Sequence, residues 1–585
     1  MGVPKLVSSF IKRLPFPNVV LNRIPDNIST LSIDMNGILH SCAQFCYAYT
    51  SEATVQRKEY VLKTPPEVLE KEYHILVTNK ISEIISHIHP SEALILAVDG
   101  VCPLAKIKQQ RQRRYRAAME RVGDNVFDSN SITTGTSFMS RLDTYLTKWI
   151  TTNQLYLPPL VIYSNHRVKG EGEHKIMDIF RDREDLQRST KSHAIYGLDA
   201  DLILLSMIAP IRNAYLVRED VTDVINIEAL KNALWSMMNR SKTAVLDFSV
   251  IMSFVGNDFL PAVVSTSDMS SALKTLMDAY RKVNKPLVTN NTLNWENLSL
   301  YLAEVASREP KMFNDLSYNL SYYPLQIVKD NVDMSVHSRH QVNMDALKLQ
   351  WYNHILSPPS TSDVSVFQKL LNDESPFGMN ENNFNDMITN YLIGVAWVLK
   401  YYTKGPREIN MSWYYPYSHA PLFSELAESV GQMNQSFYDD LDDDTPFDIP
   451  HQLLSVLPPK SLALIPSMLQ VYVTDDFSFI RDLFPDTFTV DMQGSKHGNS
   501  LVPFIDSLRI IEAVHNISFN DAQRKYYFEQ GKDFVIVRTT LPQKKSQSTG
   551  PTIANPTKEY NQKRPSHPNG SPKKIWDKVL PSSRK

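Results

Sequence analysis

The first 265 residues alternate between short apolar runs and longer amphipathic stretches. The apolar runs are TLSID at 30–34, ALILAVD at 93–99, LVIYS at 160–164, HAIYGL at 193–198 and NAYLV at 213–217. Amphipathic stretches at 67–88 and 135–154 have helical periodicity. Continuous apolar strands separated by helices are typical of a parallel sheet whose two faces are both covered. We therefore expect an α/β fold, with a mostly parallel central sheet flanked by helices in residues 1–265.

The pattern changes after residue 265. Residues 266–380 read as a helical extension, because their clearest periodic segments, at 271–283 and 294–307, are helical. Residues 381–538 form a third part, which begins with an aromatic helix at 384–405 and includes an acidic stretch at 439–450, interpreted as a solvated loop. Residues 539–585 form a basic tail rich in Pro, Ser, Thr and Asn. We expect the tail to be disordered and to attract nucleic acid without regard to base sequence.

Composition excludes several classes of protein. The three cysteines, Cys42, Cys46 and Cys102, are too few for a disulfide framework and lack a fourth zinc ligand, so we expect free or buried thiols in a reducing compartment. No segment approaches the length of a membrane span. We expect a cytoplasmic protein, with the nucleus as the alternative, and nothing in the sequence indicates an oligomer. Because the net charge is only −2, any affinity for nucleic acid must come from local basic clusters.

Acidic residues follow four of the predicted strands, and one more lies at a helix-to-turn junction in FVGNDFLP. The seven acids are Asp34, Asp99, Glu171, Glu173, Asp199, Asp201 and Asp258. A single acid at a strand end is usually a helix cap or a turn residue. Seven acids gathered at the carboxyl edge of one sheet repel one another unless cations lie between them. Their oxygen ligands suit Mg²⁺ or Mn²⁺, and two such ions would serve a phosphodiester hydrolysis.

A basic helix is expected at 100–122, directly after Asp99. Its residues Lys106, Gln110, Arg113 and Arg114 stand at i, i+4, i+7 and i+8 and therefore share one face. Guanidinium groups bind phosphate oxygens in a bidentate manner, so this face predicts a phosphate pocket beside the metal site. A solvated basic helix is the alternative interpretation. A terminal phosphate held in such a pocket would set the first phosphodiester bond at a fixed distance from the metals, as in an exonuclease.

Several of these segments resemble the motifs of a known family. The motifs are MGVPK at 1–5, SIDMNGILHSC at 32–42, DGVCPLAKIKQQRQRRYR at 99–116, KGEGEHKIMDIFR at 169–181, YGLDADLILLSM at 196–207, FVGNDFLPA at 254–262, VLKYYTKG at 398–405, SWYYPYSHAPLFSEL at 412–426, QLLSVLPPKSLALIP at 452–466 and LVPFIDSLRIIEA at 501–513. In order and spacing they resemble those of the Xrn-type 5′ to 3′ exoribonucleases. The resemblance covers most of residues 1–520 and is weakest between 265 and 380.

The resemblance implies roles for individual residues. It implies a nuclease core of the PIN/FEN type, with residues 381–538 completing the active-site pocket. The seven acids would bind two Mg²⁺ ions, with Mn²⁺ as an alternative, and the four residues of the basic helix would hold the 5′-monophosphate of RNA. His40 and Trp413 would stack the terminal base, although many members carry a further tryptophan where this chain has Met411. The chain resembles a compact member of the family, and a viral origin is one interpretation.

The implied activity is processive 5′ to 3′ degradation of single-stranded RNA with a 5′-monophosphate to nucleoside 5′-monophosphates. A structure-specific flap DNA nuclease, which has a related acid-rich core, is one alternative. An inactive RNA-binding scaffold is the other. His174 is expected to have a structural or hydrogen-bonding role, because no second histidine stands at ligand spacing. The aromatic residues near 401 and 414 are expected to lie mostly in the core.

Overall fold

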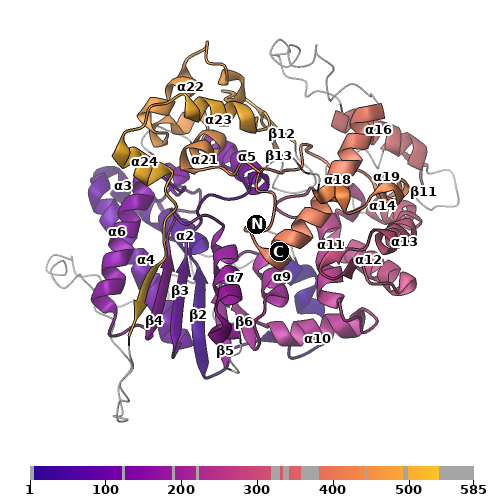
Figure 1. The fold of residues 1–585 in the computed structure, drawn as a ribbon, viewed down its shortest axis with the longest axis horizontal. Helices are drawn as coiled ribbons and strands as arrows, with labels where there is room; N and C mark the ends of the chain where they lie inside the picture. The colour runs from indigo at the N-terminus through magenta and orange to yellow at the C-terminus, as the bar shows by residue number, and fades with distance from the viewer. Residues whose placement is uncertain are drawn as a thin grey trace.

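The computed structural model describes most of the chain (Figure 1). The described residues are 6–121, 126–187, 191–218, 223–317, 330–333, 341–356, 381–439, 441, 444–491 and 499–538. The MGVPK motif at 1–5, the basic tail at 539–585, much of the extension predicted at 266–380 and part of the acidic stretch at 439–450 lie outside these residues.

The central element is an eight-stranded sheet. Its strands are β1 (Val20–Leu21), β2 (Ile28–Asp34), β3 (Ala93–Ala97), β4 (Leu160–Ser164), β5 (Ser192–Tyr196), β6 (Ala214–Val217), β7 (Val224–Asn226) and β14 (Phe534–Val537), in the order β1-β7-β6-β5-β2-β3-β4-β14. The five strands from β6 to β4 are parallel to one another, while β1, β7 and β14 pair antiparallel at the two edges. The prediction of a mostly parallel sheet is therefore confirmed.

Side chains of the parallel strands alternate between two buried faces. On β3, Leu94 and Leu96 belong to one hydrophobic cluster, and Ile95 and Ala97 belong to another. The first cluster is covered by α2 (Met35–Tyr47), α4 (Pro66–Ile88) and α6 (Ser137–Asn153), and the second by α7 (Gly172–Asp182) and α9 (Asp201–Ile208). Burial on both faces explains why the strands read as continuous apolar runs.

The second cluster extends into the helical part of the molecule, on the right in Figure 1. The helices there are α10 (Ile227–Met237), α11 (Ala244–Val255), α12 (Met269–Val283), α13 (Trp295–Ala306), α14 (Glu309–Ser317), α16 (Met344–Leu356), α18 (Glu381–Lys404) and α19 (Phe423–Ser429). One continuous core thus joins residues on both sides of the boundary predicted at 265. The predicted domain boundaries themselves stay predictions.

A third cluster lies above α5 (Leu104–Glu120) at the top of Figure 1. Its helices are α21 (Ile449–Val456), α22 (Val471–Thr474), α23 (Ser507–His515) and, at its margin, α24 (Asp521–Tyr527). Arg111 of α5 donates hydrogen bonds to the carbonyl oxygens of Ser455 at 2.7 Å, Pro503 at 3.2 Å and Leu483. The C-terminal segment is therefore packed on the α/β core, as the resemblance implied.

The remaining described elements are short. Besides short 3₁₀ turns, they are α1 (Leu6–Ser9), α3 (Val55–Lys63), α8 (Glu184–Gln187), α20 (Ser436–Asp439) and the antiparallel pairs β8 (Val288–Thr289) with β9 (Thr292–Leu293), β10 (Val332–Asp333) with β11 (Gln341–Val342), and β12 (Thr489–Asp491) with β13 (Asn499–Leu501). All three cysteines are free and buried. Among the described helices, none has the length and apolarity to cross a membrane.

Candidate active site

The parallel register brings the predicted acids at the strand ends together. Asp34, the last residue of β2, pairs with Ala97 at the end of β3, and Asp99 follows two residues later. One carboxylate oxygen from each of Asp34, Asp99 and Glu173 lies within 4.8 Å of the other two. Three carboxylates this close form an oxygen-rich site suited to a divalent cation. We refer to these three residues as the acid trio.

Gly172 explains how Glu171 and Glu173 reach this edge of the sheet. Its backbone N–H donates to Asp99 Oδ1 at 2.7 Å, where α7 begins. A Cβ atom at this position would lie 2.7 Å from Asp34 Oδ1 and 3.1 Å from the Ala97 carbonyl oxygen. The two glutamates can therefore approach the strand ends only because the residue between them has no side chain.

Lys106, in the first turn of α5, lies among the acids. Its Nζ contacts Glu171, lies 2.8 Å from Asp258 Oδ2 and 3.9 Å from Glu173 Oε1, and is almost fully buried. Burial opposes its charge, but Asp258 and Glu171 hold its pKa well above the usual value. Burial likewise opposes the ionisation of Asp258. The charge of Lys106 outweighs this effect of burial and lowers the pKa of Asp258 below its usual value. The sequence assigned Lys106 to the phosphate pocket, whereas its ammonium group here neutralises carboxylates at the boundary between the two sites.

Asp201 begins α9 and is buried. Burial, followed by the charge of Asp258, raises its pKa to about 7. Among the described residues, its Oδ1 has no hydrogen-bond partner. Asp199, two residues earlier, is close enough to Asp34 to raise the pKa of that carboxyl, after burial and Asp99. A buried carboxylate oxygen without a hydrogen-bond partner is costly unless a cation binds it. The free oxygen of Asp201 therefore fits the role of a cation ligand.

Tyr401 of α18 is a contributor that the sequence reasoning missed. Its hydroxyl donates to Glu171 Oε1 at 2.7 Å, and its ring stacks on His174 with 3.7 Å between centroids. Burial lowers the pKa of His174 well below its usual value, so this imidazole is neutral. The aromatic-rich segment near 401 was expected to be core. Its tyrosine is indeed fully buried, but it also orients a predicted metal ligand.

A pocket beside the acid trio contains part of the predicted phosphate-binding face. It is lined by Asn36, Val98, Asp99, Gly100, Gln110, Arg114, Ile132, Thr133, Thr134, Met139 and Gln452. We call it the anion pocket. Arg114 is only 7% exposed, and its Nε has no hydrogen-bond partner among the described residues. Its Nη2 lies 3.4 Å from Gln110 Oε1. Burial, and then the charge of Arg113, lowers the pKa of Arg114 to about 9, so an anion here would relieve an incompletely paired cation.

Comparison with known proteins identifies the family. Residues 1–220 match the family described as XRN 5′-3′ exonuclease N-terminus, and residues 374–567 match the Xrn1 helical domain. The chain belongs to the Xrn family.

Curated relatives cover much of this chain. The 5′-3′ exoribonuclease 1 of Schizosaccharomyces pombe is 26% identical over 88% of this chain and 48% of its own length. The human 5′-3′ exoribonuclease 1 is 26% identical over 90% of this chain and 35% of its own length. The Drosophila melanogaster 5′-3′ exoribonuclease 2 homolog is 26% identical over 86% of this chain and 66% of its own length. The chain thus spans less than half the length of the first two relatives.

The site residues fit a divalent cation, as expected of an Xrn nuclease domain. The acid trio offers three oxygen ligands within 4.8 Å of one another, and burial raises the pKa of Asp34 and Glu173. Carboxylates that are this costly to ionise side by side become stable ligands when a cation compensates them.

The two residues predicted to stack a base lie in different surroundings. His40 on α2 is half-buried, and burial together with Arg113 and Arg114 lowers its pKa to about 3, which places a neutral imidazole near the anion pocket. Trp413 is 7% exposed and packs against Trp397 with 5.3 Å between ring centroids. The structure therefore gives Trp413 the surroundings of a core residue, and its stacking role stays a prediction that no contact supports.

Met411 lies next to the start of α5. Its carbonyl oxygen accepts a hydrogen bond from the N–H of Leu104 at 2.8 Å, at the start of α5, and its side chain is half-buried. This position is therefore adjacent to the helix that carries the residues predicted to bind the 5′-phosphate.

Two other lining residues of the anion pocket, Asn36 and Gln452, lie in segments that resemble Xrn motifs, but no role was assigned to them from the sequence. Asn36 donates from Nδ2 to Asp99 Oδ2, and the backbone N–H of Asp99 donates back to Asn36 Oδ1 at 3.2 Å. Gln452 accepts from the N–H of Cys102 at 3.0 Å, across 350 residues of sequence. Asn36 could have been found from its place directly after the strand-end acid. Nothing local to Gln452 indicates its role.

Proposed function

We propose that this chain is a metal-dependent 5′ to 3′ exoribonuclease, which degrades single-stranded RNA bearing a 5′-monophosphate processively to nucleoside 5′-monophosphates. One observation carries the proposal: Asp99 belongs to the acid trio and also lines the anion pocket beside Arg114. A terminal phosphate bound by Arg114 would therefore sit next to the acids, with the first phosphodiester bond facing them. With this arrangement, each cleavage would release one nucleotide from the 5′ end of the strand.

The metal would be Mg²⁺, with two ions shared among the seven acids and Mn²⁺ as a substitute. Bound there, the ions would supply an activated water and neutralise charge on the scissile phosphate. All predicted ligand atoms are carboxylate oxygens, which favours a hard cation over zinc. Hydrolysis by this route requires no covalent intermediate.

The chain's own residues orient the reactants. Tyr401 fixes Glu171 by its hydroxyl hydrogen bond, and Gly172 fixes Asp99 by its backbone N–H. Lys106 holds a positive charge between the acids and the anion-binding face of α5. His40, neutral at pH 7, offers a flat ring for the first base without adding a charge.

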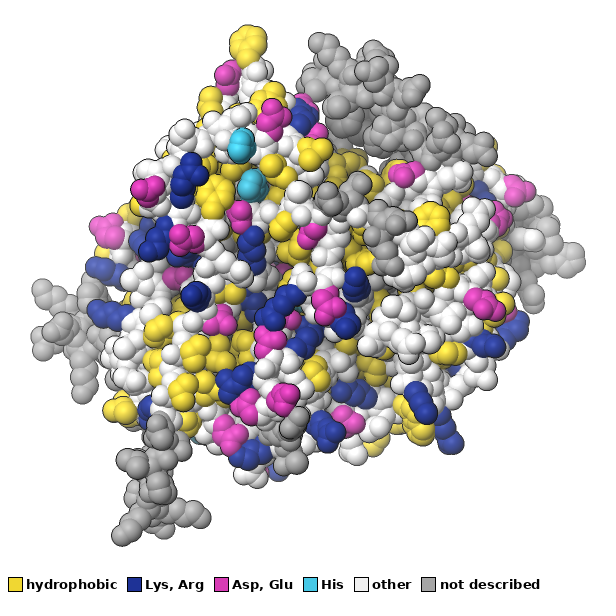
Figure 2. Space-filling model, in the orientation of Figure 1, with side chains coloured by type: hydrophobic (Ala, Val, Ile, Leu, Met, Phe, Trp, Pro, Cys, Tyr) yellow, Lys and Arg dark blue, Asp and Glu magenta, His cyan; other side chains and the backbone are white. Residues whose placement is uncertain are grey.

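Positive and negative side chains interleave over the face of the molecule drawn in Figure 2. With a net charge of −2, the molecule offers little long-range attraction to a polyanion. The buried anion pocket is therefore the best-supported source of substrate selectivity. It would recognise the 5′-phosphate at the end of the RNA, and not the phosphate backbone along the strand. A cytoplasmic location and a monomeric state, expected from the sequence, stay predictions.

A nuclease assay with matched 5′ ends tests the proposal. Body-labelled RNA is prepared with a 5′-monophosphate, a 5′-triphosphate or a 5′-hydroxyl, and is incubated with Mg²⁺ or with a chelator. We expect mononucleotides only from the monophosphate RNA and only with Mg²⁺. Asp201→Asn should abolish release, whereas Asp315→Asn, at an exposed position on α14, should not.

Each contrary outcome removes a different part of the proposal. Equal release from all three ends would remove the anion pocket. Preference for a 5′-flap DNA over RNA would favour the flap nuclease. Binding of the monophosphate RNA without any release would favour the inactive scaffold.

A further inference from the structure

The wall of the anion pocket opposite α5 is a fully buried loop. Residues 130–136 connect a short 3₁₀ turn at Ser129–Ser131 to α6, and every one of them is buried. Thr133 and Thr134 of this loop line the anion pocket. The shape of the pocket therefore depends on how the loop is held as much as on α5. We refer to residues 130–136 as the wall loop.

His166, in the segment after β4, holds the wall loop from behind. Its Nδ1 accepts a hydrogen bond from the backbone N–H of Gly135 at 3.1 Å, and its carbonyl oxygen accepts from Thr134 Oγ1 at 2.5 Å. Gly135 has φ +85°, and a Cβ atom there would lie 2.0 Å from Ile449 Cγ2, so the loop passes this point in one conformation only. Because Nδ1 accepts, the proton of the neutral ring lies on Nε2.

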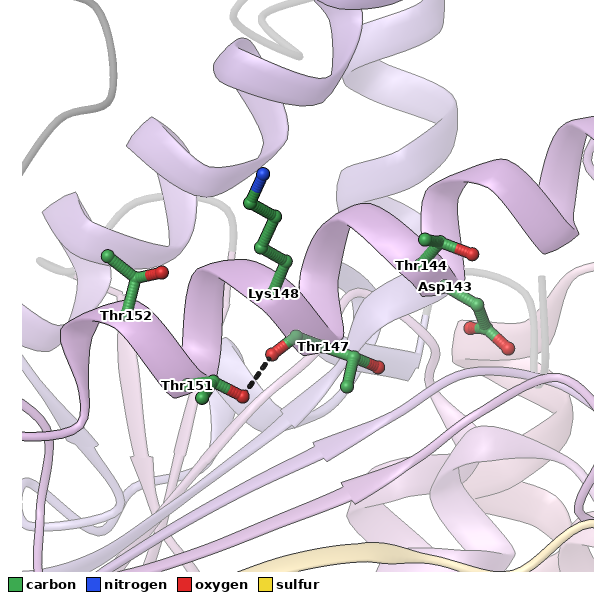
Figure 3. Close-up of a pocket in the computed structure, with 6 residues that line it drawn as sticks. All are labelled: Asp143, Thr144, Thr147, Lys148, Thr151 and Thr152. Atoms are coloured by element: carbon green, nitrogen blue, oxygen red, sulfur yellow. Dashed lines mark hydrogen bonds between the residues drawn. The ribbon is translucent and has the colours of Figure 1, made fainter.

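Asp143 of α6 faces that proton. Its Oδ2 lies 3.4 Å from His166 Nε2, an electrostatic contact and not a hydrogen bond, since Nε2 has no hydrogen-bond partner among the described residues. The other oxygen of Asp143 accepts from the hydroxyl of Tyr163 on β4. His166 is buried, while the Asp143 side chain is 15% exposed and lies in a surface hollow along α6, beside Thr144, Thr147 and Lys148 (Figure 3). The pair thus runs from the surface of α6 to the back of the wall loop.

Burial affects both members of the pair, and it raises the pKa of Asp143 to about 7. Burial, and then the positive charge of Lys175, lowers the pKa of His166 to about 3, so the ring is neutral at physiological pH. The tautomer that accepts from Gly135 at Nδ1 carries its proton on Nε2, the nitrogen nearer to Asp143.

We propose that His166, oriented by Asp143, is a positioning residue that fixes the wall loop, so that the anion pocket accepts the terminal phosphate of the substrate. This inference rests on the proposed function. Neither residue touches the acids or lines the pocket, so their effect passes through Gly135 and Thr134. Loosening the loop would weaken binding of the 5′-phosphate and leave the hydrolytic step on bound RNA unchanged.

Two substitutions separate the two nitrogens of His166. In His166→Asn the amide oxygen can take the place of Nδ1 and accept from Gly135, whereas in His166→Gln the amide lies at the position of Nε2 and leaves Gly135 without its acceptor. The probe is a 2′-O-methyl RNA oligonucleotide, which resists hydrolysis, with either a 5′-monophosphate or a 5′-hydroxyl. Loss of one buried hydrogen bond should raise Kd for the phosphorylated probe by about tenfold in His166→Gln.

The expected pattern is specific. His166→Gln raises Kd for the phosphorylated probe only and raises KM on monophosphate RNA with little change in kcat, and His166→Asn restores most of the affinity. Asp143→Ala, which should fold because its side chain reaches the surface, raises Kd in the same direction by a smaller factor. Thr144→Ala, in the same hollow, leaves both probes unaffected.

Three outcomes would overturn the inference. Unchanged Kd values in both His166→Gln and Asp143→Ala would show that the loop is held by other contacts. Equal loss of affinity for both probes, together with a lower unfolding temperature, would mean that the pair only stabilises the fold. If the wild-type protein binds the two probes equally, the proposed function fails and the inference fails with it.

Discussion

Arg114→Met should make the free protein more stable and make it a worse enzyme. Arg114 is nearly buried, its Nε has no hydrogen-bond partner among the described residues, and its Nη2 makes one contact, at 3.4 Å, with Gln110. Methionine is shorter than arginine and has no charge, but its flexible side chain can fill most of the vacated space. The substitution therefore removes an incompletely compensated cation at the cost of a small cavity.

The magnitude follows from the pKa of Arg114. Its decrease from 12.5 to about 9 corresponds to about 5 kcal/mol of lost stabilisation of the charged form, as an upper limit. Replacing buried charges with apolar side chains commonly recovers about 1–4 kcal/mol. An increase in Tm of about 1–4 °C is therefore expected without RNA. Loss of a charge-assisted contact to phosphate should cost about 2–4 kcal/mol, or roughly 30- to 1,000-fold in kcat/KM on monophosphate RNA.

Thermal unfolding and RNA decay are measured on the same preparations. The phosphorylated 2′-O-methyl probe should raise the Tm of the wild type and leave the Tm of Arg114→Met unchanged. Arg116→Met is the matched control, because Arg116 lies on the same helix and its Nε pairs with Glu120 at 2.9 Å. If Arg114→Met unfolds at a lower temperature than the wild type and still prefers the monophosphate end, the argument for an anion-seeking arginine is refuted.

Three further substitutions test other parts of the structure. Trp413→Ala should lower the unfolding free energy by about 3–5 kcal/mol with little change in KM, as for a core residue packed on Trp397; a raised KM at unchanged Tm would instead support base stacking. Tyr401→Phe should raise the Mg²⁺ concentration for half-maximal rate by about tenfold, because Glu171 loses its hydroxyl partner, and an unchanged Mg²⁺ titration would contradict this. Burial raises the pKa of Glu309 from 4.5 to about 7, so the folded state binds its proton more tightly than the unfolded state, and Glu309 lowers stability progressively as pH rises from about 4.5 to 7. In denaturant titrations at pH 5 and pH 8, the stability of the wild type relative to Glu309→Gln should fall by up to about 3 kcal/mol at the higher pH, whereas a constant difference would exclude this assignment.

The central strands and their acids could be predicted because local sequence carries the necessary information. A buried parallel strand is a continuous apolar run, and the carboxyl ends of parallel strands meet at one edge, so Asp34 and Asp99 were expected to lie together. The edge strands β1, β7 and β14 are 2 to 4 residues long, too short to show a period. The pairing of Phe534 on β14 with Tyr163 on β4 also joins distant parts of the chain.

The roles of individual side chains were less predictable where they depend on distant partners. Arg111 and Arg114 are the same residue type on one helix, yet Arg111 is committed to three carbonyl oxygens of the C-terminal segment and Arg114 faces the anion pocket. The two arginines stand three residues apart, so helical periodicity places them beside each other and could not say which partner each side chain meets. Likewise, Trp413 was chosen from a motif, and its burial depends on Trp397, which no pattern around residue 413 reveals.

The contacts of Arg111 also bear on how the protein is made. The carbonyl oxygens that it needs are 344, 372 and 392 residues further along the chain. During synthesis, α5 emerges from the ribosome long before those carbonyls exist, and its guanidinium group must stay in water until they arrive. Contacts over such separations also make folding slow. The last-made part of the core therefore controls when the basic helix settles beside the acids, and a nascent chain would not acquire a finished catalytic centre until synthesis of the folded region is nearly complete.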